Sequence, residues 1–374
     1  MYYVALRMLM GDTTRYLALV FGLTFSTTLI VQQGSIFTGI LRRTGASIES
    51  VPQPDIWVMH PATRYFDEHK PIPDTALQRV RGVPGVEWGE RMFLGEGSAQ
   101  LPNGTYAPLR IIGVERVSKV GLPQWMDAGT PEMLERPYAV FWDNIGLPLY
   151  SNIKPGDVLQ INDHRAEVAG LVTAPRAFIS NPTVYATYER ALEYSPGERL
   201  RLTFVLVRVK AGYDTKQVAR EIERATGLGA ETTQDFFWQT VWFYVSNTGI
   251  AINFGITVLL GLIVGVAIAG QTFYSFTVEN TKHFGTLKAM GTSNSTLIKM
   301  VLLQAGLVGI LGWGLGAGAA SLFGMRITSR SLIAFMLTPQ LLWISLGFTL
   351  LTVLLAAVVS IRRVLRIEPA IVFR

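Results

Sequence analysis

Few residues in this sequence are of a type and spacing that could carry out chemistry. None of its 374 residues is cysteine, which excludes thiol catalysis, thiolate metal sites, iron–sulfur clusters and disulfide bonds. The histidines are His60, His69, His164 and His283. His60 and His69 flank Asp67 and Glu68, and these side chains could ligate a metal. Their spacing matches no established metal motif, so we interpret this segment as a solvated loop.

The common hydrolytic motifs are also missing from the sequence. It contains no HExxH, GxSxG or GxxxxGK[ST] pattern, and therefore no recognisable metalloprotease, serine hydrolase or nucleotide-binding constellation. We expect no catalytic residue, no metal site and no cofactor in this chain, and we expect that it is not an enzyme.

Charged residues are distributed unevenly, and this pattern indicates the elements that organise the chain. They make up 16% of the sequence, against roughly 25% in soluble domains. Asp, Glu, Lys and Arg are absent from residues 16–41, 236–278, 300–325 and 331–361. Each window exceeds the about 20 residues that a helix needs to cross a bilayer. We predict four transmembrane helices, over residues 15–43, within 236–278, over 299–325 and over 339–361, where Pro339 suits a first turn.

Two of these windows allow a second interpretation. The first follows Arg7 and Arg15, as a signal peptide follows its basic region, but it is longer than the roughly 7–15 apolar residues of a signal. The second could hold two spans. Its first part is rich in aromatic residues, which is typical of a membrane-interface belt: Phe236, Phe237, Trp238, Trp242, Phe243 and Tyr244. We predict an amphipathic stalk there, followed by one span.

The segment 44–235 is long enough for a folded domain of its own. Short runs rich in Val, Ile, Leu and aromatics predict strands at 55–59, 109–114, 139–142, 158–161, 166–172 and 203–209. Helices are predicted at 73–80 and 215–226, and Pro155-Gly156-Asp157 predicts a hairpin turn. We expect Trp57, Trp125 and Trp142 in the core. The fold class is an α-helical membrane protein with four transmembrane helices and one large α+β extracytoplasmic domain between helices 1 and 2.

Basic residues near the ends of the spans predict the orientation. On the side of the termini lie Arg7, Arg15, Lys282, Lys288, Lys299, Arg362, Arg363, Arg366 and Arg374, and on the other side Arg42, Arg43, Arg326 and Arg330. The positive-inside rule then places both termini in the cytoplasm. Residues 1–14 become a cytoplasmic amphipathic helix, 279–298 a cytoplasmic coupling segment, 326–338 a short outer loop and 362–374 a cytoplasmic tail. This distribution explains the basic pI without a nucleic-acid partner.

The four charge-free windows contain none of the ionisable residues that a proton- or ion-coupled transporter is expected to carry in mid-membrane, so a solute pore made by these helices alone is poorly supported. Their amides, Gln304 among them, are expected to form hydrogen bonds between helices. The glycine pairs Gly261/Gly265, Gly312/Gly316 and Gly314/Gly318 have GxxxG spacing, which permits close helix approach. The sequence does not decide whether these glycine pairs pack against helices of the same chain or against a second copy of the chain.

The segment between the second and third spans carries the clearest resemblance to a known family. The run His283-Phe-Gly-Thr-Leu-Lys-Ala-Met-Gly291 resembles the EIGxLKAxG signature of FtsX-like permeases, the MacB-type (type VII) ABC transporter subunits. The matching positions are Gly285, Leu287, Lys288, Ala289 and Gly291, whereas His283 replaces the family's acidic residue. The ending Arg366-Ile-Glu-Pro-Ala resembles the family's tail, and Pro84-Gly-Val-Glu and residues 153–161 resemble its periplasmic core. The DevC branch is the most similar.

This resemblance implies a permease subunit of an ATP-driven exporter in the inner membrane of a bacterium. Such permeases form homodimers, bind a separate cytoplasmic ATPase that holds ATP and Mg, and transmit its motion to the periplasmic domain, a process called mechanotransmission. The docking residues implied here are Glu279, Lys282, His283, Phe284, Gly285, Leu287, Lys288 and Gly291.

In the MacB and DevC branches a periplasmic adaptor and a TolC-like outer-membrane channel complete the exporter, which implies a lipid-like or amphipathic substrate. The alternatives within the family are a haem or lipoprotein-releasing exporter and an FtsX-like regulator that activates a partner without moving solute. From another class, a membrane-anchored sensor with a ligand-binding outer domain remains possible.

Overall fold

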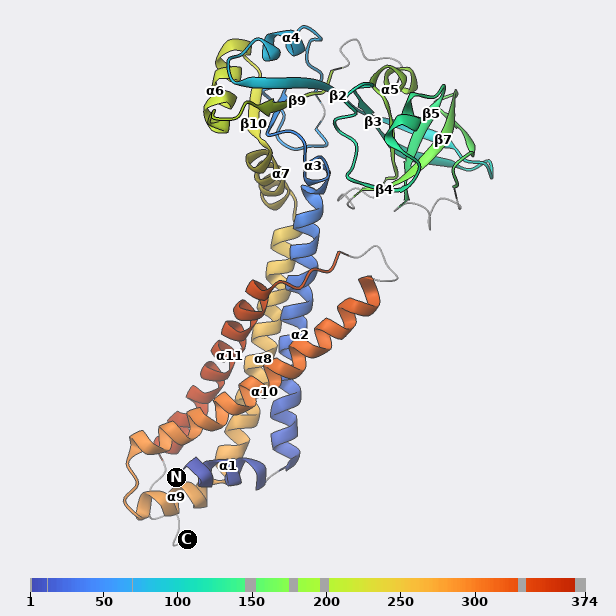
Figure 1. The fold of residues 1–374 in the computed structure, drawn as a ribbon. Coiled ribbons are helices and arrows are strands. Elements are labelled where there is room, and N and C mark those ends of the chain that lie inside the picture. Colours follow the sequence, from blue (N-terminus) through green and yellow to red (C-terminus); the bar gives the residue numbers. More distant parts are fainter. Residues whose placement is uncertain are drawn as a thin grey trace. The chain divides into compact units, whose positions relative to one another are not determined.

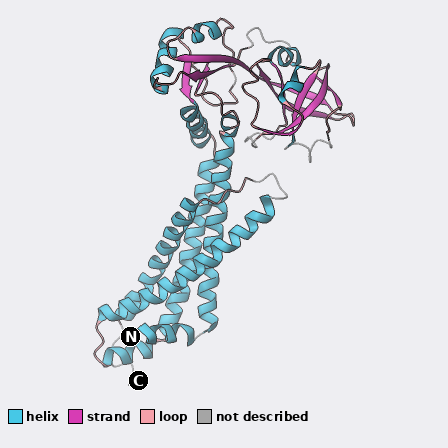
Figure 2. Ribbon diagram, in the orientation of Figure 1, coloured by secondary structure: helices cyan, strands magenta, loops and turns pink. Residues whose placement is uncertain are grey.

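The computed structural model describes residues 2–11, 13–68, 70–144, 153–174, 181–195, 202–328 and 334–366. The chain divides into two compact units. The first, which we call the helical unit, comprises Met1–Ile40 and Gly249–Arg374; the second, the α+β unit, comprises Leu41–Thr248. Figure 2 shows that the described strands lie in the α+β unit.

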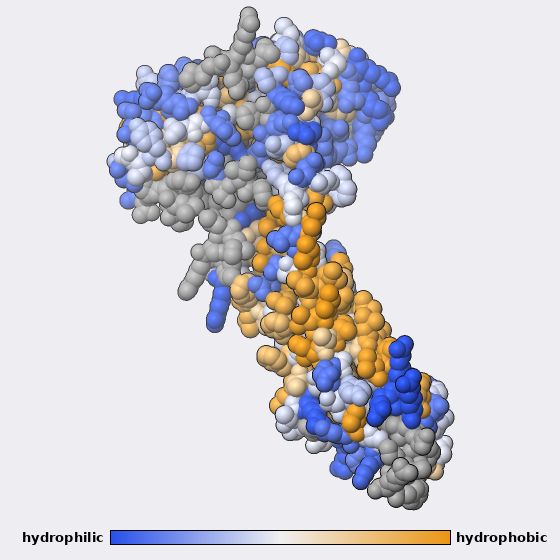
Figure 3. All heavy atoms as spheres, turned by 180° about the vertical axis from the view of Figure 1, so that it is seen from behind, coloured by the Kyte–Doolittle hydropathy of each residue, from blue (hydrophilic) through white to orange (hydrophobic). Residues whose placement is uncertain are grey.

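Four long helices dominate the helical unit: α2 (Thr13–Thr44), α8 (Ile250–Glu279), α10 (Asn294–Thr328) and α11 (Pro339–Leu365) (Figure 1). Each is long and apolar enough to cross a membrane, and Figure 3 shows hydrophobic residues over much of this unit's surface. Pro339 lies in the first turn of α11, and the Leu341 N–H donates to the Thr338 hydroxyl at 3.3 Å, which caps the helix. The four predicted transmembrane helices are confirmed.

Two short helices, α1 (Tyr2–Gly11) and α9 (Thr281–Ala289), pack against these long helices. Ala5 and Leu9 of α1 are buried in the same apolar cluster as Phe284 and Leu287 of α9. The buried Gln304 of α10 donates a hydrogen bond from Nε2 to the Ala5 carbonyl at 2.7 Å. This amide therefore joins two helices, as the sequence predicts for the polar residues of the spans.

Two of the three glycine pairs with GxxxG spacing, Gly261/Gly265 and Gly312/Gly316, face helix α2 of the same chain. A Cβ on Gly261 would approach Ile30 Cγ1 to 3.5 Å, and one on Gly265 would overlap the Ser26 side chain. Ser26 Oγ also donates to the Gly261 carbonyl at 2.8 Å. On α10, a Cβ on Gly312 would meet Leu23 Cβ at 2.6 Å and one on Gly316 would meet the Thr24 carbonyl oxygen at 2.7 Å. Gly265, Gly312 and Gly316 therefore let α8 and α10 approach α2, whereas a Cβ at Gly261 would make only an ordinary van der Waals contact.

The second glycine pair of α10 is arranged differently. Among the described residues, no atom lies within 4 Å of a Cβ built on Gly314 or Gly318. This pair leaves an exposed strip on α10, so a contact with another copy stays a prediction for Gly314 and Gly318.

The described strands of the α+β unit form one sheet with the order β10-β1-β9-β2-β3-β8-β5-β7-β4, in which β6 also pairs with β2 and β7. The strands are β1 (Ile56–Met59), β2 (Val86–Gln100), β3 (Tyr106–Val114), β4 (Trp125–Ala128), β5 (Ala139–Asp143), β6 (Val158–Ile161), β7 (His164–Thr173), β8 (Thr183–Thr187), β9 (Phe204–Val209) and β10 (Gly229–Thr232). The shorter helices of this unit are α3 (Ala46–Glu49), α4 (Ala76–Arg81), α5 (Tyr188–Tyr194), α6 (Thr215–Thr226), α7 (Thr233–Asn247) and the 3-10 helix η1 (Pro131–Glu135).

Strand β2 connects the two halves of this sheet (Figure 1). Residues from Val86 to Met92 pair with β9, whereas residues from Met92 to Gln100 pair with β3. The sequence predicts the other long strands but not β2, because its glycines and charged residues resemble a loop. Its β structure is stabilised by the neighbouring strands on its two sides.

The predicted hairpin turn and the predicted burial of Trp125 are wrong. The hairpin between β6 and β7 turns at Asn162-Asp163, both with positive φ, and not at Pro155-Gly156-Asp157, which forms a turn before β6. Trp57 and Trp142 are fully buried, but Trp125 is 67% exposed on β4. Strand β4 lies at the end of the strand order, so one of its edges lacks a neighbour among the described strands.

Candidate functional site

Helix α9 has two distinct faces, and they divide the predicted docking residues. Phe284 is 1% exposed and Leu287 is 8% exposed, and both pack in the apolar cluster of the helical unit, with Gly285 buried beside them. The opposite face carries Lys282, His283, Thr286, Ala289 and, just after the helix, Met290, all exposed. This spacing of three to four residues is that of an amphipathic helix. Buried residues hold α9 in place, and exposed ones offer a surface.

Two further predicted docking residues, Lys288 and Gly291, lie at and just after the end of α9. Lys288 donates from Nζ to the Leu365 carbonyl at 2.9 Å, near the last turn of α11, where helix carbonyls lack partners. Gly291 has φ +90°, a conformation that favours glycine. The Thr292 N–H then reaches back to the Leu287 carbonyl at 3.1 Å. Lys288 and Gly291 therefore stabilise the tight connection from α9 to α10.

Glu279, the remaining predicted docking residue, forms an ion pair with Arg15. The pair joins the last residue of α8 to the first turn of α2. The Glu279 side chain is 54% exposed and the Arg15 side chain 28%, so water screens the attraction. The sequence did not identify this pairing, since 264 residues separate the partners.

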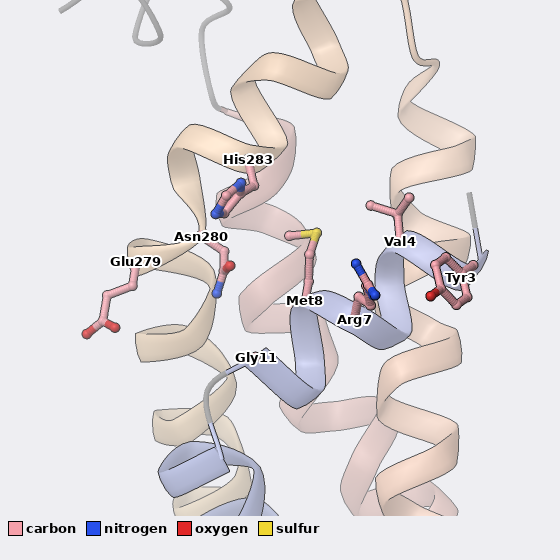
Figure 4. Close-up of a pocket in the computed structure, with 8 residues that line it drawn as sticks. All are labelled: Tyr3, Val4, Arg7, Met8, Gly11, Glu279, Asn280 and His283. Atoms are coloured by element: carbon pink, nitrogen blue, oxygen red, sulfur yellow. The ribbon is translucent and has the colours of Figure 1, made fainter.

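A groove of about 590 Å³ lies between α1 and the junction of α8 with α9. It is lined by Tyr3, Val4, Arg7, Met8, Gly11, Glu279, Asn280 and His283 (Figure 4). Arg7 stacks over the Tyr3 ring at 5.4 Å. The groove therefore places two predicted docking residues, Glu279 and His283, opposite the N-terminal helix.

A buried polar cluster in the α+β unit links α3, near the first residue of this unit, to α7, near its last residue. Arg110 of β3 is 7% exposed and pairs through Nη2 with Asp67 Oδ1 at 2.6 Å. Its Nη1 donates to Ser47 Oγ at 3.1 Å, in the short helix that follows α2. Tyr244 of α7 donates to Asp67 Oδ2 at 3.3 Å. Burial raises the pKa of the Tyr244 phenol, which keeps it a donor. We call these four residues the Arg110 cluster.

The Arg110 cluster is not predicted from the sequence, although the sequence contains one signal for it. Arg110 is a charged residue within the otherwise apolar run Leu109–Val114. A charge on a buried strand requires a partner. The sequence alone cannot show that this partner comes from the loop containing Asp67.

That loop is solvated only in part: Pro61, Ala62 and Arg64 are exposed, but our interpretation of residues 60–69 as a solvated loop is wrong for the residues that pack against the domain. Phe66 is buried, Tyr65 stacks on Phe243 of α7 with ring centroids 4.1 Å apart, and Gln239 Nε2 donates to the Thr63 carbonyl at 3.2 Å. Hydrogen bonds donated by Arg64 lower the pKa of Glu68 to about 2. The described residues contain no group of potential metal ligands, and His69 lies outside them.

Helix α7 uses its aromatic residues in two ways. Phe236 and Tyr244 are buried in the α+β unit, and Phe243 stacks on Tyr65. Trp238 and Trp242, one helical turn apart, are 59% and 69% exposed. The membrane-interface belt predicted for the six aromatics is therefore wrong for the buried residues and stays a prediction for the two tryptophans.

Comparison with known proteins gives two family matches. Residues 17–225 match the MacB-like periplasmic core domain, and residues 236–369 match the FtsX-like permease C-terminal domain. An uncharacterised ABC transporter permease of Mycobacterium tuberculosis is 24% identical over 316 residues, which are 81% of this chain and 79% of that protein.

Other relatives are matched over smaller shares of their length. The macrolide export ATP-binding/permease protein MacB of Escherichia coli K12 is 26% identical over 215 residues, 55% of this chain and 31% of MacB. An uncharacterised permease of Methanocaldococcus jannaschii is 26% identical over 43% of this chain and 41% of its own length. Among solved structures, the periplasmic region of MacB from Actinobacillus actinomycetemcomitans is 16% identical, covering 54% of this chain and 96% of that one at a TM-score of 0.37.

Proposed function

Because this chain belongs to the FtsX-like permeases with a MacB-like periplasmic core domain, we propose that it is the permease subunit of an ATP-driven exporter. The ATPase is a separate cytoplasmic subunit, and the permease works as a homodimer with both termini in the cytoplasm. The substrate is lipid-like or amphipathic, and it leaves through a periplasmic adaptor and an outer-membrane channel. ATP and Mg are bound by the ATPase and not by this chain.

The two faces of α9 are the observation that carries this proposal. Phe284 and Leu287 anchor the helix in the helical unit, while Lys282, His283 and Met290 remain exposed on it. An anchored helix with a free face can receive the movement of a docked subunit and pass it to the helices that hold it. The exposed face combines a cation with an apolar side chain that is 69% exposed, Met290, and exposed apolar residues are frequent at protein interfaces.

The contacts of α9 support the idea that movement of its exposed face is passed to the long helices. Helix α9 follows α8 after Asn280 alone, and Lys288 links it to the end of α11. The Glu279–Arg15 pair links the same region to the start of α2. A shift of α9 therefore acts on three long helices of the helical unit. A nucleotide drives such a shift only if the ATPase contacts differ between its two states.

The last residue of α2 and the first residue of α8 are close in sequence to segments held by the Arg110 cluster. Helix α2 ends at Thr44, three residues before Ser47, and Tyr244 lies six residues before the start of α8. The Arg110 cluster ties both segments to the central strand β3. In our proposal this cluster passes movement of the long helices to the sheet.

Replacing exposed residues of α9 should abolish binding of the ATPase without unfolding the chain. We expect the double variant Lys282→Glu/Met290→Glu to lose co-purification with its partner ABC ATPase and to lose stimulated ATP hydrolysis. Its thermal stability in detergent should stay close to wild type, because neither side chain is buried.

The matched control is Lys299→Glu, which reverses an exposed charge near the start of α10, outside α9. It should bind the ATPase normally. Lys288→Glu and Gly285→Trp are weaker probes, because the first breaks the bond to Leu365 and the second overfills a buried position. Undiminished binding and hydrolysis in the Lys282→Glu/Met290→Glu variant would refute the docking assignment.

A further inference from the structure

The groove between α1 and the α8–α9 junction is a candidate binding site that shares only His283 with the exposed face of α9. Two separate parts of the sequence form its walls: Tyr3, Arg7 and Met8 come from α1, and Asn280 and His283 come from the junction. Figure 4 shows the Arg7 and His283 side chains on opposite walls. The volume of about 590 Å³ lies within the range of small-molecule sites, roughly 300–1,000 Å³.

The charges that line the groove favour an anion. Among the described residues, no carboxylate pairs with Arg7, whose guanidinium contacts the Tyr3 ring. The one carboxylate of the lining, Glu279, pairs with Arg15 and points away from α1 in Figure 4. The Arg7 guanidinium carries several N–H donors in a fork that matches a phosphate group. His283 supplies a further ring donor from the opposite wall.

Apolar residues beside these donors indicate what kind of molecule carries the anion. Val4 and Met8 line the groove itself, and Val4 and Met10 of α1 are 40% and 63% exposed. A helix with cationic and apolar side chains next to an apolar bundle is suited to the boundary between headgroups and acyl chains. A soluble acidic protein segment would leave these apolar side chains without partners.

We propose that this groove binds the phosphate headgroup of an anionic phospholipid, with Arg7 and His283 donating to the phosphate and Val4 and Met8 contacting the first acyl carbons. Lipid binding in this groove needs no ATPase and can be measured on the permease alone, although His283 also belongs to the exposed face of α9. Basic pockets between helices at the membrane surface are known to bind acidic lipid headgroups in other proteins. A bound lipid would also join α1 to the α8–α9 junction.

The test measures phosphatidylglycerol and phosphatidylcholine binding to the purified full-length chain in detergent, by native mass spectrometry and without ATPase. We expect wild type to retain phosphatidylglycerol in preference to phosphatidylcholine. Arg7→Gln should weaken phosphatidylglycerol binding about tenfold, the size expected for loss of one hydrogen bond to a charged group. Adding His283→Gln should weaken it further, and Arg7→Lys should restore part of the affinity because the charge is kept.

Lys299→Gln is the control, since it removes an exposed cation that does not line the groove, and it should retain phosphatidylglycerol as wild type does. Competition by glycerol phosphate alone should be weak, because the apolar contacts are missing. Equal retention of the two lipids by wild type, or unchanged phosphatidylglycerol binding in Arg7→Gln, would overturn the proposal. Unchanged lipid binding with weakened ATPase association in Arg7→Gln would instead assign the groove to the ATPase contact.

Discussion

Replacing Arg110 by methionine is expected to destabilise the α+β unit more than any other single substitution of a charged residue discussed for this chain. The variant leaves Asp67 without its main cationic partner, in a position where the carboxylate side chain is 15% exposed. Removing one member of a buried ion pair costs about 3–5 kcal/mol. At roughly 2–4 °C per kcal/mol for a domain of this size, the midpoint of thermal unfolding should fall by roughly 6–20 °C. Differential scanning fluorimetry of the full chain in detergent measures this shift.

Two comparisons distinguish the Arg110 cluster from an ordinary ion pair. Arg208→Met removes an ion pair with Asp55 in which the side chains are 45% and 33% exposed, and it should cost about 0–1 kcal/mol. The double variant Arg110→Met/Asp67→Leu replaces the pair by apolar side chains and should recover part of the loss. If Arg110→Met and Arg208→Met shift the midpoint equally, the cluster has no special role.

Replacing Gly316 by valine should give the largest effect within the helical unit. The new Cβ would lie 2.7 Å from the Thr24 carbonyl oxygen and 2.7 Å from Thr27 Cβ. The first is a backbone atom of α2 and cannot move without displacing that helix. Thr28 Oγ1 also donates to the Gly316 carbonyl at 3.3 Å, so separating the helices would lengthen this bond. Overpacking typically costs about 1–3 kcal/mol, a lowering of the unfolding midpoint by roughly 2–12 °C.

Gly318→Val is the matched control, because it makes the same substitution half a turn further along α10. Among the residues that the structure describes, nothing lies within 4 Å of its Cβ, so the single chain should unfold at the wild-type temperature. Size-exclusion chromatography with light scattering adds a second measurement. Loss of a dimer in Gly318→Val, without loss of thermal stability, would place that face of α10 between two copies. Equal destabilisation by both variants would contradict the assigned packing.

Much of the fold follows from local patterns in the sequence. The charge-free windows identify α2, α8, α10 and α11 because a membrane helix must be apolar along most of its length. Helix α6 is predicted with its observed bounds from its one apolar face, and in the structure the Asp214 side chain caps its start and Gly227 ends it. Strand β2 is missed because pairing with distant strands, and not its own composition, makes it extended.

The candidate site is predicted less completely, because a motif does not show which way its side chains point. The signature run identifies the right helix, α9, but contains both its anchoring residues and its exposed ones. The faces become clear only when Phe284 and Leu287 are seen to pack with residues of α1, α10 and α11. The Arg15–Glu279 pair and the Arg110 cluster join residues far apart in sequence, and no local pattern reveals such contacts.

The most direct test of ATPase docking on α9 is a single-cysteine cross-linking scan over residues 281–291. The chain contains no cysteine, so each introduced thiol is the only one present. A thiol-directed photocross-linker on Lys282→Cys, His283→Cys, Thr286→Cys or Met290→Cys should capture the ATPase, whereas one on Phe284→Cys or Leu287→Cys should not. Docking of the ATPase on the exposed face of α9 predicts this helical periodicity of capture. Equal capture at all positions, or capture confined to the buried face, would contradict it.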